Sequence, residues 1–129
     1  KGWIQEGIKM YLKRLPGLEV IEIKDNNQTK EEHTIKEIIS KNEILVTLNE
    51  NGQSFTSKQL ATKLLNSHNH NIIFVIGGAS GLSPSLNNFA SWQLSLSPLT
   101  FPHEIARLLL IEQLYRVNTI TQGGPYHKE

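Results

Sequence analysis

The sequence contains no cysteine, which excludes disulfide bonds and thiolate metal sites. No stretch approaches the about 18 consecutive apolar residues that a transmembrane helix needs. The opening residues, KGWIQEGIKM, form neither a signal peptide nor a membrane anchor. Together these absences predict a cytoplasmic protein that does not enter a membrane.

Charge is also scarce in this sequence. The formal net charge is +1, so a single chain is not expected to hold nucleic acid by a broad electrostatic attraction. Acidic residues are absent from the whole stretch between Asn51 and His103. A nucleoside bound by this stretch would be held by backbone groups and apolar walls, because the acidic residue that usually anchors a ribose is missing.

The pattern of apolar residues predicts the order of the elements. The chain has 129 residues, which suits one compact domain. We expect strands at 18–23, 43–48, 71–76 and 94–97, and helices at 4–15, at 33–41, from Thr56 onward, at 84 to about 91, and at 103–117. This alternation predicts an α/β fold with a mainly parallel sheet.

Local signals set some of the boundaries. Residues 24–32 are polar and charged and predict a loop. Asn51 and Gly52 predict a turn that ends the second strand. Thr56 and Gln59 have the spacing of a capping box, which predicts a helix start.

The segment IIFVIGGASGLSPSL, residues 72–86, passes from a strand through a glycine loop into a helix that Ser83 and Pro84 begin. Gly77 and Gly78 fall at the carboxyl end of the strand, where open α/β sheets bind ligands. The loop lacks the lysine of a P-loop and the spacing of a dinucleotide fingerprint, so neither ligand is expected. Either the glycines contact another ligand, or they only make a tight turn.

Two other features of the sequence bear on function. His68 and His70 are spaced like metal ligands, but they stand in a polar stretch without a third ligand, so no metal is expected. The last helix is apolar around most of its circumference, which predicts burial on more than one side. Such burial indicates either a subunit interface or a central core helix.

Several motifs in the C-terminal third resemble a known family. FVIGGASGLSPSL is followed by SLSPLTFPHEIARLLLIEQLYR and then by GGPYHK. The similarity extends back through ILVTLNENGQSFTSKQLA, VIEI and WIQEGIKMYLKRL, so it covers almost the whole chain in order. The sequence is similar to the ribosomal RNA large-subunit methyltransferase H family, also called the YbeA family, of the SPOUT superfamily.

The resemblance implies an α/β-knot fold, a mainly parallel sheet flanked by helices with a deep trefoil knot in the C-terminal segment. It implies S-adenosylmethionine as the cofactor. It also implies a homodimer that methylates N(3) of a pseudouridine in 23S ribosomal RNA of the assembled 70S ribosome. Methyl transfer from a sulfonium is a displacement in which the cofactor supplies the reactivity, so a site with few charged side chains suffices.

The resemblance assigns the cofactor to the end of the second strand, the first glycine of the pair and the loop before the last helix. These positions are Leu48, Gly77, Leu96, Ser97, Pro98, Leu99, Thr100 and Phe101.

The remaining polar residues of the matching segments are expected to meet the substrate. Tyr126 and His127 are predicted to act catalytically at the acceptor base. His103, Arg107 and Arg116 are predicted to bind RNA. Arg116 could instead be an ordinary cation near a helix C-terminus, and His103 could be a packing group of the first helical turn.

The sequence departs from the family at its start, because members begin with a further strand before the part that matches GWIQEG. We therefore expect residues 1–129 to form a single SPOUT methyltransferase domain without that strand. The alternative function is a non-catalytic SPOUT-like domain that binds ribosomal RNA or the ribosome surface, which the intact LTFPH and PYHK motifs disfavour. A regulatory nucleotide-binding domain is disfavoured by the missing acidic ribose anchor.

Overall fold

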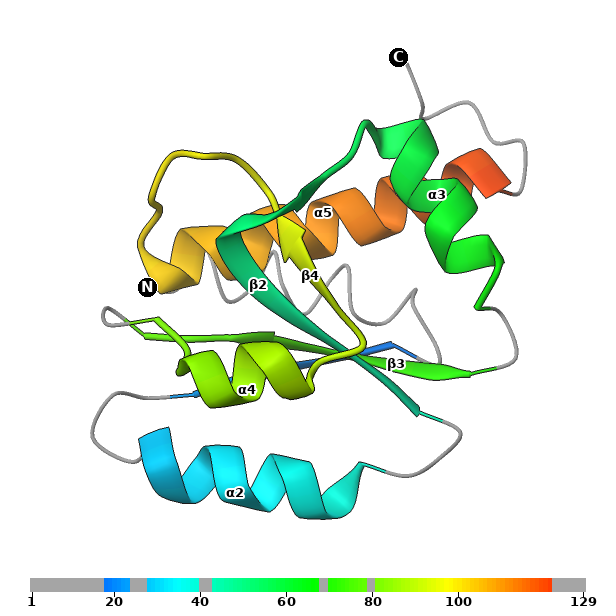
Figure 1. Cartoon of the computed structure of the whole chain (residues 1–129). Coiled ribbons are helices and arrows are strands. Elements are labelled where there is room, and N and C mark those ends of the chain that lie inside the picture. The colour runs from blue at the N-terminus through cyan, green and yellow to red at the C-terminus, as the bar shows by residue number, and fades with distance from the viewer. Residues whose placement is uncertain (1–17, 24–27, 40–42, 68–69, 79–80, 122–129) are drawn as a thin grey trace.

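Strands and helices alternate along the chain in the computed structural model, which describes residues 18–23, 28–39, 43–67, 70–78 and 81–121. The elements are β1 (Leu18–Glu22), α2 (Gln28–Ile38), β2 (Glu43–Ser54), α3 (Ser57–Leu65), β3 (Asn71–Ile76), α4 (Pro84–Phe89), β4 (Trp92–Ser95) and α5 (His103–Thr121) (Figure 1). The first predicted helix, residues 4–15, lies outside the described residues, as do Tyr126 and His127.

The four strands form one sheet in the order β1-β3-β2-β4, and every pairing is parallel. The predicted α/β class with a mainly parallel sheet is therefore confirmed. β3 lies inside the sheet, and all of its residues from Ile72 to Ile76 are buried. A parallel strand covered on both faces carries a continuous apolar run, which is what the sequence NIIFVI provides.

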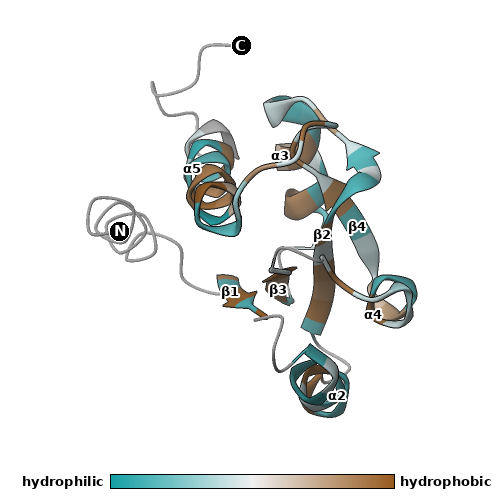
Figure 2. Ribbon diagram, turned by 90° about the vertical axis from the view of Figure 1, so that its left-hand side faces the viewer, coloured by the Kyte–Doolittle hydropathy of each residue, from teal (hydrophilic) through white to brown (hydrophobic). Residues whose placement is uncertain are grey.

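Helices cover both faces of the sheet (Figure 2). On one face, α3 and α5 pack over alternate residues of the strands, with Phe74 of β3 and Leu114 of α5 in the same core cluster. On the other face, Ile35 of α2 and Leu86 of α4 pack with Val75 of β3. The period of two along each strand sends neighbouring residues to opposite cores.

The helix starts that depend on local signals are confirmed. The Thr56 hydroxyl accepts from the Gln59 backbone N–H, and the Gln59 side chain accepts from the Thr56 backbone N–H. Ser83 caps α4 by accepting from the Leu86 N–H at 3.2 Å, and Pro84 is the first residue of that helix.

Several predicted boundaries were wrong. α2 begins at Gln28, inside the stretch 24–32 that was expected to be a loop, and it buries a glutamate as well as an isoleucine. β2 continues to Ser54 because a register shift between Leu48 and Gln53 lets the chain bulge and then pair with β4 again. α5 extends to Thr121, and β4 begins at Trp92.

No helix within the described ranges is both long and apolar enough to cross a bilayer.

Candidate functional site

A cleft of about 750 Å³ opens at the bulge of β2 and at the carboxyl ends of β3 and β4. The connection after β2 passes over one face of the sheet, through α3, and the connection after β3 passes over the other, through α4. The cleft thus lies at the switch point where α/β sheets hold their ligands. Its volume is in the range of small-molecule sites.

The structure brings the predicted cofactor residues together from three separate parts of the chain. β2 contributes one of them, the glycine loop after β3 another, and the segment before α5 the rest. Those that line the cleft are Leu48, Gly77, Leu96, Ser97, Leu99, Thr100 and Phe101. Pro98 is not among the lining residues.

The glycine loop turns back tightly on itself at the cleft wall. Gly78 and Gly81 form an isolated bridge, in which the Gly81 N–H donates to the Gly78 carbonyl at 3.0 Å. A Cβ on Gly77 would lie only 2.6 Å from the carbonyl carbon of Gly81. Gly81 itself has φ of +74°, which favours glycine. The glycines therefore make the tight turn, and the same residues line the cleft.

The segment between β4 and α5 is tied to the bulge of β2. The Thr100 hydroxyl donates to a carboxylate oxygen of Glu50 at 2.7 Å, and the Ser95 hydroxyl donates to the Glu50 carbonyl at 3.1 Å. The Ser97 hydroxyl accepts from the Leu99 N–H at 3.1 Å. Sequence reasoning missed Glu50, because its role depends on a strand that returns to β4 after the bulge.

Two asparagines that sequence reasoning also missed lie on the cleft wall. Asn49 donates to the Gln93 side chain at 2.8 Å, and Gln93 donates to the Asn87 carbonyl at 3.0 Å. The side-chain oxygen of Asn87 is buried and accepts no hydrogen bond from the described residues.

His103, Arg107 and Glu22 meet at the edge of the cleft. His103 is the first residue of α5 and lines the cleft, and its Nε2 lies 3.0 Å from a carboxylate oxygen of Glu22. An Arg107 guanidinium nitrogen lies 3.7 Å from the other oxygen. The His103 side chain is 44% exposed, so it does not act as a core packing group.

Sequence reasoning missed Glu22, although one signal pointed to it. Glu22 is the last residue of β1 and is in register with Ile76, the last residue of β3. Its place at the carboxyl edge of a parallel sheet was predictable. Its contacts with α5 were not.

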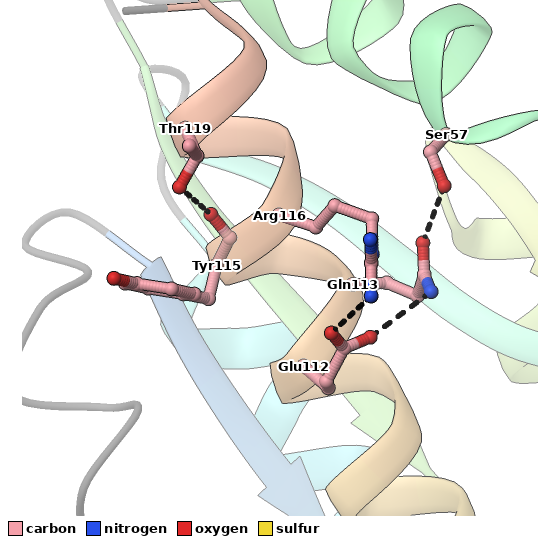
Figure 3. A network of polar contacts seen from close by, with 6 residues as sticks. All are labelled: Ser57, Glu112, Gln113, Tyr115, Arg116 and Thr119. Atoms are coloured by element: carbon pink, nitrogen blue, oxygen red, sulfur yellow. Dashed lines mark hydrogen bonds and ion pairs between the residues drawn. The ribbon is translucent and has the colours of Figure 1, made fainter. Parts of the chain in front are cut away.

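Arg116 is not among the residues that line the cleft and lies in the C-terminal half of α5 (Figure 3). It donates to Glu112, one turn earlier, at 2.8 Å. Gln113 donates to the other oxygen of Glu112 and accepts from the Ser57 hydroxyl, which links α5 to α3. The structure therefore groups His103 and Arg107 at the cleft and leaves Arg116 in a helix-to-helix network.

The chemistry that this site can perform is limited by its few charged groups. Within the described part of the chain, no three histidine or acidic side chains cluster as metal ligands would. The walls offer glycine backbone, leucine side chains and amide groups. Such a site suits a ligand that carries its own reactive group, which the protein only has to bind and orient.

Proteins of known family have sequences similar to this chain. The sequence model of the family described as "Predicted SPOUT methyltransferase" matches residues 1–127. The ribosomal RNA large subunit methyltransferase H of Prochlorococcus marinus (strain NATL1A) is 89% identical over 129 residues, which is 100% of this chain and 89% of that protein. The protein of the same name from strain MIT 9313 is 53% identical over 128 residues, 99% of this chain and 89% of that protein.

One solved structure is similar only at a low level. The SpoU methyltransferase AviRb from Streptomyces viridochromogenes, in complex with AdoMet, is 13% identical, with a TM-score of 0.45, over 75% of this chain and 34% of that one. This similarity is too low to assign a family, so the family assignment depends on the sequence matches. This chain belongs to the SPOUT methyltransferase family, as a member of the ribosomal RNA large subunit methyltransferase H group.

Proposed function

We propose that this protein binds S-adenosylmethionine in the cleft and transfers its methyl group to N(3) of a pseudouridine in 23S ribosomal RNA. One observation carries the proposal. Cofactor residues that the family resemblance assigns from three distant segments, among them Leu48, Gly77 and Phe101, line a single cleft.

The residues of the cleft fit this cofactor. The sulfonium supplies the activated methyl group, so the protein needs no nucleophile or metal of its own. The backbone at Gly77 and Gly78 and the side chains of Leu48 and Leu96 offer a surface for an adenosine without phosphate. Asn87 adds an amide side chain to the same cleft wall.

The side chains at the cleft edge are suited to hold the nucleotide to be methylated. Glu22 keeps His103 and Arg107 together, so their donors are presented from one place. The Arg107 side chain is 31% exposed, so part of it can reach a nucleotide beside the cleft. We assign His103 and Arg107 to RNA binding, and we keep Arg116 as a weaker candidate because it lies away from the cleft.

The N(3) proton of the pseudouridine must leave during the reaction, and a positioned base would accelerate that step. Tyr126 and His127 are our candidates for this role, from the family resemblance. A histidine with an ordinary pKa near about 6.5 can accept a proton at neutral pH.

We further propose that the protein works as a homodimer on the assembled 70S ribosome in the cytoplasm, with each chain a single domain that carries the family's trefoil knot. Leu109 of α5 is 37% exposed although its neighbours Leu110 and Ile111 are completely buried. This exposed leucine lies on a side of α5 that the core of its own chain does not cover, which supports a surface that a partner could cover.

Calorimetry with S-adenosylmethionine and with ATP tests the cofactor assignment. We expect S-adenosylmethionine to bind and ATP not to bind, because the glycine loop of residues 77–81 has no lysine to receive phosphates. Equal affinity for the two ligands would contradict the proposal. Binding without methyl transfer to ribosomes that lack the modification would favour the non-catalytic alternative.

A further inference from the structure

A buried carboxylate lies on the face of the sheet opposite α5 and outside the cleft. Glu32 of α2 is 6% exposed, and it is the single buried acidic residue in the part of the chain that the structure describes. Burial of an ionised carboxylate is costly unless hydrogen bonds compensate for the lost water. The groups that donate to Glu32 therefore indicate what this residue does.

The donors come from the loop that leads into α4 and from the first turn of α2. The Ser83 N–H donates to one carboxylate oxygen at 3.0 Å, and the Ser83 hydroxyl donates to the other. The Gln28 side-chain amide donates to Glu32 at 3.1 Å and to the Gly81 carbonyl at 3.2 Å. Glu32 and Gln28 thus hold the loop at two points, Gly81 and Ser83.

These contacts also keep Glu32 ionised. Burial by itself raises the pKa of the carboxyl group, but the hydrogen bonds from Ser83 and Gln28 lower it. The positive charge of Lys36 acts in the same direction, and the net result is a pKa below the usual range. A permanent negative charge therefore faces the loop at neutral pH.

The loop held in this way forms the cleft wall. Gly81 and Leu82 line the cleft, and their backbone atoms lie so close to Gly77 that a Cβ there would be 2.6 Å from one and 2.9 Å from the other. Because Gly77 is in close contact with the backbone of Gly81 and Leu82, a shift at Gly81 would displace Gly77 as well.

The same carboxylate acts on α4. The Ser83 hydroxyl, which donates to Glu32, accepts from the Leu86 N–H at 3.2 Å as the cap of that helix. The next residue is Asn87, which lines the cleft. Glu32 therefore helps to fix the position of the glycine loop on one side of the cleft. It also helps to fix the start of α4, the helix that places Asn87 in the cleft wall.

We propose that Glu32 is a positioning residue for the cofactor, which fixes from behind the sheet the distance between the Gly77–Gly78 wall and Asn87. The inference rests on the proposed binding of S-adenosylmethionine in this cleft. It assigns a residue that touches neither the cleft nor the reacting atoms.

A purely structural role is the competing explanation, because α2 also holds α4 through Lys36, which donates to the Ser85 hydroxyl and lies 5.8 Å from the Phe89 ring centroid. The two roles differ in what they change. Loss of a structural tie lowers thermal stability and the amount of active enzyme. Loss of a positioning residue raises the Kd and the KM for S-adenosylmethionine and leaves kcat at saturation nearly unchanged.

Glu32→Gln is the test variant, since it keeps the size of the side chain but places an NH2 group where donors from Ser83 and Gln28 converge. We expect the Kd for S-adenosylmethionine, from calorimetry, and its KM to rise about tenfold or more, with kcat within about threefold and the KM for ribosomes unchanged. Glu37→Gln is the matched control: it removes the same charge from the same helix, at a side chain that is 67% exposed and lies 3.5 Å from His33. It should leave all of these constants unchanged.

A folded Glu32→Gln protein with wild-type Kd would overturn the inference, and so would an equal loss in Glu37→Gln. If Glu32→Gln does not fold, Gln28→Ala decides, because it removes the contact with Gly81 and leaves the carboxylate in place. We expect a rise in Kd of about threefold or more for that variant, and no rise would refute the proposal. Wild-type protein that binds no S-adenosylmethionine would instead contradict the proposed function itself.

Discussion

Gly77 and Gly81 stand in the same loop, but they need to be glycine for different reasons. A Cβ at Gly77 would meet backbone atoms of Gly81 and Leu82, which cannot move aside without moving the cleft wall. A Cβ at Gly81 would have no described residue within 4 Å, and the strain there comes from φ of +74°. Substitutions at the two positions therefore distinguish a steric clash, at Gly77, from backbone strain, at Gly81.

We predict that Gly77→Ala lowers the affinity for S-adenosylmethionine at least about tenfold, because the wall must shift. Gly81→Ala should reduce the free energy of unfolding by about 1–2 kcal/mol and change the affinity by less than about threefold. Calorimetry and urea denaturation of the two variants give these quantities. If Gly77→Ala binds as tightly as the wild type, the loop is not part of the cofactor site.

Residues whose role depends on distant partners could not be predicted from the sequence. Glu32 lies in a polar stretch that resembles a loop, and only its contact with Ser83, far along the chain, shows why a helix buries it. The contacts of Glu22 and Asn87 likewise depend on residues far along the chain and could not be predicted. By contrast, Gly77 could be predicted, since its place after an apolar strand is a local signal.

At the scale of the element, α5 has two kinds of leucine. Leu110 is completely buried in the core of its own chain, whereas Leu109 is 37% exposed. The sequence left open whether the helix is apolar all round because of a partner or because it is central. The structure accounts for Leu110 by the core, whereas Leu109 lies outside the core and is the position at which the proposed interface can be tested.

We predict that Leu109→Asp yields a folded monomer that keeps the wild-type circular dichroism spectrum. Leu110→Asp should fail to fold, because an unpaired charge in the core costs several kcal/mol. Sedimentation velocity and circular dichroism distinguish the two outcomes. A Leu109→Asp protein that stays dimeric would exclude this face of α5 as the interface, and a monomeric wild type would refute the dimer.

Elements were predictable where their signals are local. The capping box at Thr56 and the Ser83-Pro84 start were correct, because each cap is formed by residues within one turn. The end of β2 was wrong, because Asn51 and Gly52 have the composition of a turn but form a bulge. Pairing with β4 keeps the chain extended there, and that pairing is not visible in the local sequence.

At the scale of the whole molecule, the site is assembled from segments that are far apart in the chain. Physical reasoning alone placed only Gly77 and Gly78 at the edge of the sheet. The resemblance added Leu48 and the segment from Leu96 to Phe101, and the fold brings these together with one exception, Pro98. The catalytic assignment of the C-terminal residues stays a prediction that an experiment on the complete enzyme can test.

We predict that deletion of Tyr126–Glu129 abolishes most catalysis and leaves cofactor binding intact. The family resemblance assigns the cofactor to Leu48, Gly77 and the segment from Leu96 to Phe101 and assigns the C-terminal residues to the acceptor base, so the Kd for S-adenosylmethionine should change by less than about threefold. Methyl transfer should fall at least about a hundredfold, which is the usual effect of a lost acid–base group. The measurements are calorimetry and incorporation of tritiated methyl groups into ribosomes that lack the modification.

The matched control removes Glu129 alone, so that Tyr126 and His127 are kept, and it should retain wild-type activity. Naked 23S RNA is assayed beside the ribosomes, because a chain with a net charge of +1 has little electrostatic attraction for free RNA. Its substrate must then be recognised by shape, and two subunits of a dimer can meet an assembled ribosome at the same time. Full activity of the shortened protein would rule out a catalytic tail, and faster methylation of naked RNA than of ribosomes would rule out recognition by shape.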